Sequence, residues 1–427
     1  MRIEPKNIRN AAFFFIFSYA QAQYFSHTLG RASIMIGLLC FTLIVLSIRT
    51  LPKPSAPEIS LTLIAVATAC LYALLELFGQ KTSFSTRLLF PYAAIQIILF
   101  LIAFSGSNTE SQLKGLNRSL MVYLAVEFII IIGQFLYLAT GHGFAPQPGD
   151  DSTFYGITGS KGNPNDTAMI YSILTLYLSI YAINYSNRTQ ALLLTTSAII
   201  VCALTLSRTV TVITTLNLFL ITYYSIVRHP KTKPTKTYQT LWFASTASLF
   251  LVFAFWAHSM QYIEGSQVLQ RSLQRIETMG SLADDSSVLF RLTVLQRLAE
   301  SLPRLGIGTF SDLDYSLFFQ PSDHSLMTTN PHSLIAEFSF LFGWPGLILI
   351  SSYFLIISYL VAFKTTLSFI SKTLIIFSFF LTQSVPSSLL DDHTFFLIFI
   401  MFWLAFRKKH LYSPPLTPLQ TKGSNYQ

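Results

Sequence analysis

Three side chains in this 427-residue chain have the chemistry to act on an anionic substrate: His332, Arg208 and Arg291. His332 directly precedes a long apolar run that begins at residue 334. A histidine with a reference pKa of about 6.5 can be neutral at a water–lipid boundary, so it can accept a proton from a hydroxyl nucleophile. The alternative is that His332 only marks the start of this helix, where Asn330 or Ser333 would satisfy the first amide groups.

The arginines suit a phosphate ligand. Arg208 lies in Ser207-Arg208-Thr209, where two apolar runs meet, and Arg291 and Arg297 lie in a polar stretch at 260–332. A planar guanidinium binds phosphate through two parallel hydrogen bonds. The alternatives are a snorkelling anchor for Arg208 and an ordinary exposed face for Arg291. Gathered on one membrane face with His332, the arginines favour a site for a polyanion such as a lipid pyrophosphate.

Weaker signals lie nearby. Asp392 and His393 precede the last apolar run and could orient a base or bind a cation, or they could form a solvated helix start. Glu337, five residues after His332, is expected to make a polar contact within the helix bundle. The three cysteines all fall in predicted spans and no CxxC or HExxH spacing occurs, so the sequence predicts no disulfide framework, metal site or cofactor.

The composition defines the scaffold that must position these residues. The chain is 52% hydrophobic and only 11% charged, with a mean hydropathy of +0.52, which predicts an all-α polytopic membrane protein. A helix needs about 20 apolar residues to cross the hydrocarbon core. Twelve runs meet this length approximately, at 11–28, 31–48, 57–78, 88–106, 117–139, 166–185, 190–206, 209–227, 240–259, 334–362, 370–386 and 393–407.

Positively charged residues orient these spans. With the N-terminus in the cytoplasm, most Lys and Arg residues fall in cytoplasmic segments, and both termini are cytoplasmic. The chain then divides into nine spans at 1–259, an outer loop domain at 260–332, three spans at 333–409 and a tail at 410–427 that is predicted to be disordered. The net charge of +9 is therefore an orientation signal, and we do not expect nucleic-acid binding.

The outer loop is predicted to contain one amphipathic helix. Asp284-Asp285-Ser286 offers an N-cap, and Pro303 ends the pattern. The helix could lie along the membrane surface, with Arg297 opposite its apolar stripe and Arg291 at the edge of the stripe. A turn at Gly306-Ile307-Gly308 is expected to follow. The apolar residues that recur at helical spacing in this segment are Val288, Leu292, Leu295 and Ala299.

Several of these motifs together resemble the O-antigen ligase family. His332-Ser333, nine residues, Gly343, two residues and Gly346 match the family's signature. Ser207-Arg208-Thr209 resembles its arginine region, and Arg291 followed by Leu302-Pro303 and Gly306-Ile307-Gly308 resembles its outer-loop pattern. Gly162-Asn163-Pro164-Asn165-Asp166 also resembles the family. The resemblance covers about half of the chain, at 159–346.

The resemblance implies a GT-C-like membrane fold and a location in the bacterial inner membrane, with the large loop in the periplasm. Family members transfer a glycan from undecaprenyl pyrophosphate to lipid A-core without a nucleotide or metal cofactor. By resemblance, Arg208 and Arg291, with Arg297 as a further candidate, would bind the pyrophosphate. His332 would activate or position the acceptor hydroxyl.

Two alternatives stay open. An O-antigen or capsule polymerase would use the same donor, and Arg297 followed by ten residues and Gly308 fits an arginine–glycine spacing described for polymerases. A lipid or solute transporter is the other alternative, because Glu127 lies near the middle of a predicted span, where acids are functional candidates. Gln96 and Gln134 could simply solvate Glu127. Transporters usually show repeated halves, whereas this chain has a single large loop late in its sequence.

Overall fold

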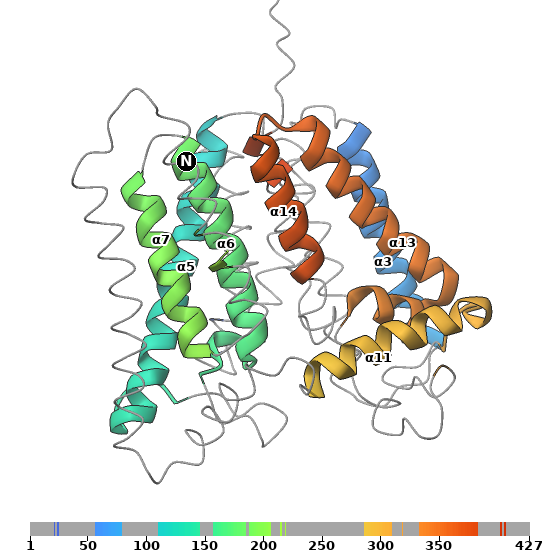
Figure 1. Ribbon diagram of the computed structural model, residues 1–427, viewed down its shortest axis with the longest axis horizontal. Coiled ribbons are helices and arrows are strands. Elements are labelled where there is room, and N and C mark those ends of the chain that lie inside the picture. The colour runs from blue at the N-terminus through green and yellow to red at the C-terminus, as the bar shows by residue number, and fades with distance from the viewer. Residues whose placement is uncertain are drawn as a thin grey trace, which may run out of the picture.

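The computed structural model describes residues 56–78, 110–145, 157–184, 188–205, 286–309 and 333–382, together with single residues elsewhere in the chain. All regular elements in these segments are helices, as the composition predicts (Figure 1). The long helices are α3 (Ala56–Phe78), α5 (Glu110–Thr140), α6 (Pro164–Asn184), α7 (Arg188–Thr205), α11 (Ser286–Ser301), α13 (Leu334–Lys364) and α14 (Phe369–Thr382). Two short 3-10 turns are η2 (Gly159–Lys161) and η5 (Leu302–Arg304).

Three of the described helices are long and apolar enough to cross a membrane. They contain the segments Asn117–Leu138, Pro164–Ile183 and Leu334–Lys364, and each coincides with a span predicted from hydropathy. The apolar helices α3, α7 and α14 coincide with three more of the predicted runs. The other six predicted runs fall almost entirely outside the described residues, so the twelve-span layout and the GT-C-like fold stay predictions.

Polar side chains link α5, α6 and α7 inside their apolar interface. The Tyr177 hydroxyl of α6 donates a hydrogen bond to Asn117 Oδ1 of α5 at 2.9 Å. Ser172 of α6 contacts the Cys202 thiol of α7, with 3.4 Å between Oγ and Sγ. Buried polar contacts of this kind stabilise helix pairs where lipid provides no hydrophobic force between helices. These contacts fix α6 against both of its neighbours.

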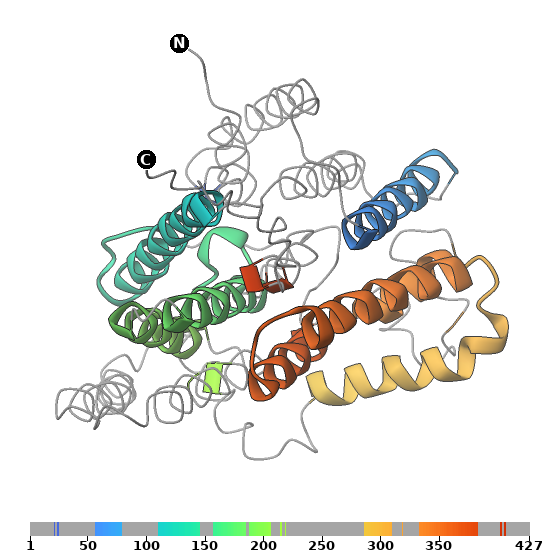
Figure 2. The same cartoon turned by 90° about the horizontal axis from the view of Figure 1, so that it is seen from above.

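Basic residues at several helix ends lie on the same side of the bundle. Figure 1 shows that α3, α5, α7 and α14 begin at the end of the bundle where α6 and α13 finish. Lys364 ends α13, Arg188 begins α7, and Lys372 lies in the first turn of α14. The amphipathic helix α11 lies at the opposite end, beside α13 in both views (Figures 1 and 2). The basic residues and α11 are therefore on opposite sides of the apolar bundle.

Candidate functional site

The site begins at a break inside α13. Gly343 has φ 62° and ψ −141°, so α13 consists of one helical segment before Gly343 and a longer one after it. A residue without a Cβ adopts this backbone conformation at little steric cost, and Pro345 fits the first turn of the second segment because the amide it lacks would have no helical partner there. The sequence predicted a single uninterrupted helix here, so the break is a new feature.

The turn that follows α11 fills this break. The Trp344 amide donates to the Gly306 carbonyl at 3.1 Å, and the Thr309 amide donates to the Phe340 carbonyl at 2.8 Å. A helix break leaves amides and carbonyls without partners, and such groups are costly inside a membrane protein. The turn thus supplies one partner on each side of the break. We call this contact the glycine joint, formed by residues 306–309 and 340–344.

Close backbone approach explains the glycines of the joint. A Cβ on Gly308 would lie 2.4 Å from the Leu341 carbonyl oxygen, and one on Gly343 would lie 2.3 Å from the Gly306 carbonyl oxygen. Gly346 is equally confined, because its Cβ would lie 2.0 Å from the Phe338 carbonyl oxygen. The predicted turn at 306–308 is confirmed, and two separate glycine motifs of the sequence meet in one contact.

The helix α11 is confirmed where its cap and periodicity predicted it. Leu292, Leu295 and Ala299 of its predicted apolar stripe are exposed, and Leu292 has 58% of its surface accessible. A second apolar face, formed by Phe290, Val294 and Leu298, instead packs into the core. This face was missed, although its four-residue spacing is visible in the sequence. α11 therefore packs through one apolar face and leaves the other open, as a helix lying along a membrane surface requires.

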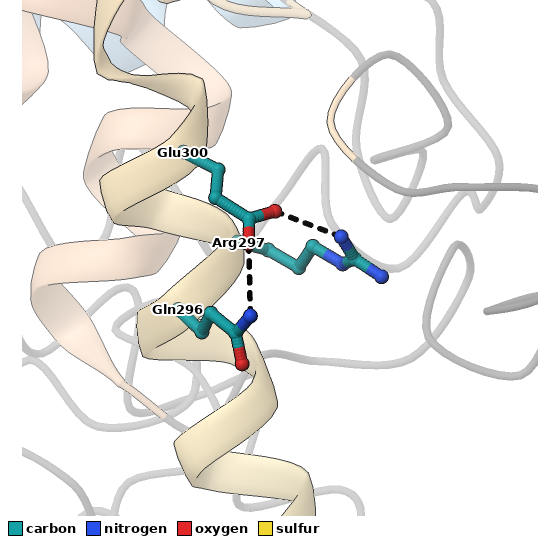
Figure 3. Close-up of polar contacts among 3 residues, drawn as sticks. All are labelled: Gln296, Arg297 and Glu300. Carbon is teal, nitrogen blue, oxygen red and sulfur yellow. Dashed lines mark hydrogen bonds and ion pairs between the residues drawn. The ribbon is translucent and has the colours of Figure 1, made fainter.

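Arg297 forms an ion pair within α11. Its Nη1 lies 2.8 Å from Oε2 of Glu300, and the Gln296 side-chain amide donates to Oε1 of Glu300, also at 2.8 Å (Figure 3). The hydrogen bond from Gln296, followed by that from Arg297, holds the pKa of Glu300 below its usual value. A phosphate bound at Arg297 would have to compete with this carboxylate.

Arg291 projects from another side of the same helix. It lies six residues before Arg297, which corresponds to about 120° around the axis and about 9 Å along it. Its side chain is half-buried, between the packed face of Val294 and Leu298 and the exposed face of Leu292. The two arginines of α11 therefore differ in setting, and Arg291 is the one beside the packed face.

The first segment of α13 starts at a capped, buried end. The Ser333 hydroxyl accepts a hydrogen bond from the Ala336 amide at 3.4 Å, so Ser333 is the cap that the sequence allowed. Glu337 lies in the first turn and is buried, consistent with the expected contact inside the bundle. His332 directly precedes this cap in the sequence. The N-terminal end of α13, which follows the predicted base in the sequence, is thus capped and buried.

Several predicted site residues lie outside the described part of the chain: Arg208, His332, Asp392 and His393. Of the predicted set, the structure describes Arg291, Arg297 and Glu337, and the glycine joint connects the helices that carry them. Within the described residues, no group of three His, Cys, Asp or Glu side chains is arranged to hold a metal ion.

Glu127 belongs to a separate buried polar cluster, between α5 and the turn before α6. Its Oε1 accepts from the Ser160 amide at 2.8 Å, and its Oε2 accepts from the Ser160 hydroxyl at 2.6 Å. The Gln21 side-chain amide donates to Oε2 at 3.0 Å. Of the two glutamines expected to solvate Glu127, Gln134 binds the backbone of Thr158 and Gly159, and Gln96 lies outside the described residues. Glu127 is therefore engaged by donors of the chain itself.

The residues that the structure describes form an all-helical bundle with three helices able to span a membrane, which indicates a membrane-associated protein, and the glycine joint lies at one end of this bundle. No family model matches the sequence, and a search of curated proteins finds no match to it.

Proposed function

We propose that this protein is a glycosyltransferase of the O-antigen ligase type, transferring a glycan from undecaprenyl pyrophosphate to lipid A-core at the periplasmic face of the bacterial inner membrane. The glycine joint is the observation that carries the proposal. It brings Gly306 and Gly308 of the outer-loop pattern against Gly343 of the ligase-like signature. Motifs that resemble one family and lie far apart in sequence thus share one contact.

The spacing around the joint supports the roles assigned to Arg291 and His332. Arg291 lies ten residues before the end of α11, and Ser333 lies ten residues before the break at Gly343. Each interval corresponds to about 15 Å of helix. Because α11 contacts α13 and the turn after α11 binds the break in α13, Arg291 and the helix start that follows His332 lie on two helices held together at the joint.

The proposed reaction uses cationic arginine side chains and a histidine base. The acceptor hydroxyl attacks the anomeric carbon, the bond from that carbon to the pyrophosphate oxygen breaks, and His332 takes the hydroxyl proton. Negative charge grows on the leaving undecaprenyl pyrophosphate, where Arg291 and Arg208 stabilise it more strongly than water would. Attack from the face opposite the leaving group inverts the anomeric configuration. No nucleotide or metal takes part in this scheme.

The distribution of charge supports the proposed orientation. Basic residues at the ends of α7, α13 and α14 lie at the end of the bundle away from α11. Lys and Arg accumulate on the cytoplasmic side of membrane proteins. This arrangement favours a periplasmic α11 and cytoplasmic termini. The transport alternative rested on Glu127, and the contacts of that carboxylate with Ser160 and Gln21 give it a structural explanation.

Deletion in the native host, followed by lipopolysaccharide gels, tests the proposed function. Loss of a ligase leaves lipid A-core without any O-units while lipid-linked polymer accumulates. Loss of a polymerase leaves core carrying a single unit, which would support the alternative. An unchanged gel contradicts both.

Complementation with point variants tests the site. Arg291→Ala should lower transfer by about 100-fold or more, as expected when a charge-stabilising donor is lost. Arg304→Ala removes an exposed arginine of η5 in the same segment, and activity should stay within about twofold. Arg208→Ala and His332→Ala should also abolish transfer at normal expression. Wild-type activity in all three predicted site variants would refute the assignment.

A further inference from the structure

The turn before α6 is bound to α5 through its backbone. The amides of Thr158 and Gly159 both donate to Oε1 of Gln134, at 3.0 and 2.8 Å, and the Ser160 amide donates to Glu127. The Gln134 side-chain amide donates in return to the Gly159 carbonyl at 3.1 Å. Three consecutive backbone amides are thus bound by two side chains of one helix. We call Glu127 and Gln134 the α5 clamp.

The clamp lies within a candidate membrane span. Glu127 is about 15 Å of helix from either end of the segment Asn117–Leu138, and Gln134 is about 6 Å from its Leu138 end. Non-helical backbone is tolerated at that depth only where protein or a water-filled cavity satisfies its polar groups. Glu127 and Gln134 are both buried, and they provide this satisfaction for the 157–163 turn. An acid in the middle of a span thereby has a specific structural purpose.

We propose that the 157–163 turn is a re-entrant turn, held inside the membrane by the α5 clamp, which positions the start of α6 to contact the glycan of the lipid-linked donor. The contact between α6 and the glycan rests on the proposed function. Thr158 and Ser160 are buried against α5, whereas Asn163 and Asn165 are partly exposed. Asparagine side chains both donate and accept hydrogen bonds, which matches the hydroxyl groups of sugars.

Glu127 and Gln134 form different hydrogen bonds, so they tolerate different substitutions. Glu127 receives hydrogen bonds from three donor groups, so either of its oxygens serves as an acceptor. Gln134 must accept at one atom and donate at the other. Glu127→Gln can keep its oxygen towards the Ser160 amide, and its new amide group can donate to a rotated Ser160 hydroxyl, so it loses only the hydrogen bond from Gln21. Gln134→Glu instead places a carboxylate oxygen against the Gly159 carbonyl, so it should be the more disruptive exchange.

Gly159 completes the clamp. It has a φ of +64°, and a Cβ there would lie 2.4 Å from Thr167 Cγ2 and 2.6 Å from Glu127 Oε1. Gly159→Ala should therefore displace the turn. Gly141→Ala is the matched control, because Gly141 has a similar φ of +75° and no atom within 4 Å of an added Cβ. The pair separates the steric clash from the backbone conformation.

Cysteine accessibility in the full-length protein tests the re-entrant turn. The reporter is Thr158→Cys, in a background whose three native cysteines are replaced by alanine, with the protein in lipid nanodiscs and a membrane-impermeant maleimide as the probe. The buried reporter should react slowly. Gln134→Leu, Gln134→Glu and Gly159→Ala should raise its rate by about tenfold or more, because bonds to buried amides are lost. Glu127→Gln should raise it less, and Gly141→Ala should leave it unchanged.

Wild-type labelling rates in all clamp variants that remain monodisperse would overturn the re-entrant turn. If Gln134→Glu does not fold, the milder Glu127→Gln variant decides. A labelling rate of Glu127→Gln between that of wild-type protein and that of the other clamp variants supports the clamp, and a wild-type rate contradicts it.

A transfer assay with purified protein tests the positioning role. Glu127→Gln should raise the KM for the lipid-linked donor while kcat per folded molecule changes little. A purely structural role would lower the amount of folded protein and leave KM unchanged. If labelling rises in the clamp variants but wild-type protein transfers no glycan, the proposed function fails and the re-entrant turn stands. If wild-type protein is active and the clamp variants keep wild-type labelling and KM, the clamp fails and the proposed function stands.

Discussion

Adding one methyl group at Gly308 should separate α11 from α13, whereas the same change at Gly306 should not. Both glycines have positive φ values, +82° and +49°, so alanine at either position carries a backbone cost of about 1–2 kcal/mol. The surroundings differ. A Cβ on Gly308 would lie 2.4 Å from the Leu341 carbonyl oxygen, while the nearest atom to a Cβ on Gly306 is the Arg304 carbonyl oxygen at 3.9 Å.

The contacts around the two glycines determine the expected difference in stability between the two variants. Relieving the overlap at Gly308 requires the turn to move away from α13, and overpacking of this kind costs about 1–3 kcal/mol. That movement also weakens the bonds from Thr309 to Phe340 and from Trp344 to Gly306, each worth about 1 kcal/mol. We therefore expect Gly308→Ala to be less stable than Gly306→Ala by about 3 kcal/mol.

Thermal unfolding of the purified protein measures this difference. For a large domain, about 1 kcal/mol lowers the Tm by about 2 °C, so the two variants should differ by about 6 °C. Both are heated at the same rate, because membrane proteins often unfold irreversibly and the apparent Tm then depends on rate. Gly308→Ala should also lose transfer activity, since the joint fixes Arg291. Equal Tm values for the two variants would refute the glycine joint as the contact that holds α11.

Two further predictions concern the surface of α11. Because hydrogen bonds depress the pKa of Glu300 in the folded state, its stabilising effect is present above the unfolded pKa and is lost as the pH falls through the folded pKa. Glu300→Gln should remove this part of the acid dependence of the Tm, and an unchanged pH profile would count against the pair with Arg297. If α11 lies along the membrane, a fluorophore attached to a Leu292→Cys variant should be quenched by lipid-bound quenchers. The same label on a Glu300→Cys variant, about 80° further around the helix and also exposed, should be quenched less, and equal quenching would contradict this orientation.

Local patterns predicted the elements of the site well. Hydropathy located the described spans, and an N-cap with four-residue periodicity located α11. Gly306-Ile307-Gly308 predicted a turn. These features depend on neighbouring residues, so a single sequence contains them. The break at Gly343 was not predicted, although Gly343-Trp344-Pro345 is a local sign of it, because a proline inside a helical pattern ends or kinks the helix before it. Its partner, Gly306, lies 37 residues earlier in the chain.

Long-range contacts also explain what was missed at Glu127. The sequence identified it as an acid within a predicted span and named Gln96 and Gln134 as possible partners, but its donors are the amide and hydroxyl of Ser160 and the side chain of Gln21. A backbone amide has the same chemistry in every residue except proline, so no side-chain pattern marks it as a partner. From the sequence we could recognise residues whose side chains cap or pattern their own helix. Residues that bind the backbone of a distant segment could be recognised only in the folded structure.

Both interruptions of helical order follow one physical rule. Gly343 breaks a candidate span, and the 157–163 turn precedes another, and in each case groups from a distant segment bind the exposed backbone. Such interruptions are costly beside lipid and persist only where the surrounding structure supports them. Figure 1 shows η2 and the first part of α13 at the end of the bundle where α11 lies, away from the basic helix ends. Irregular backbone at membrane depth is tolerated where it is buried in protein or lines a cavity, so this end of the bundle is where we place the proposed transfer reaction.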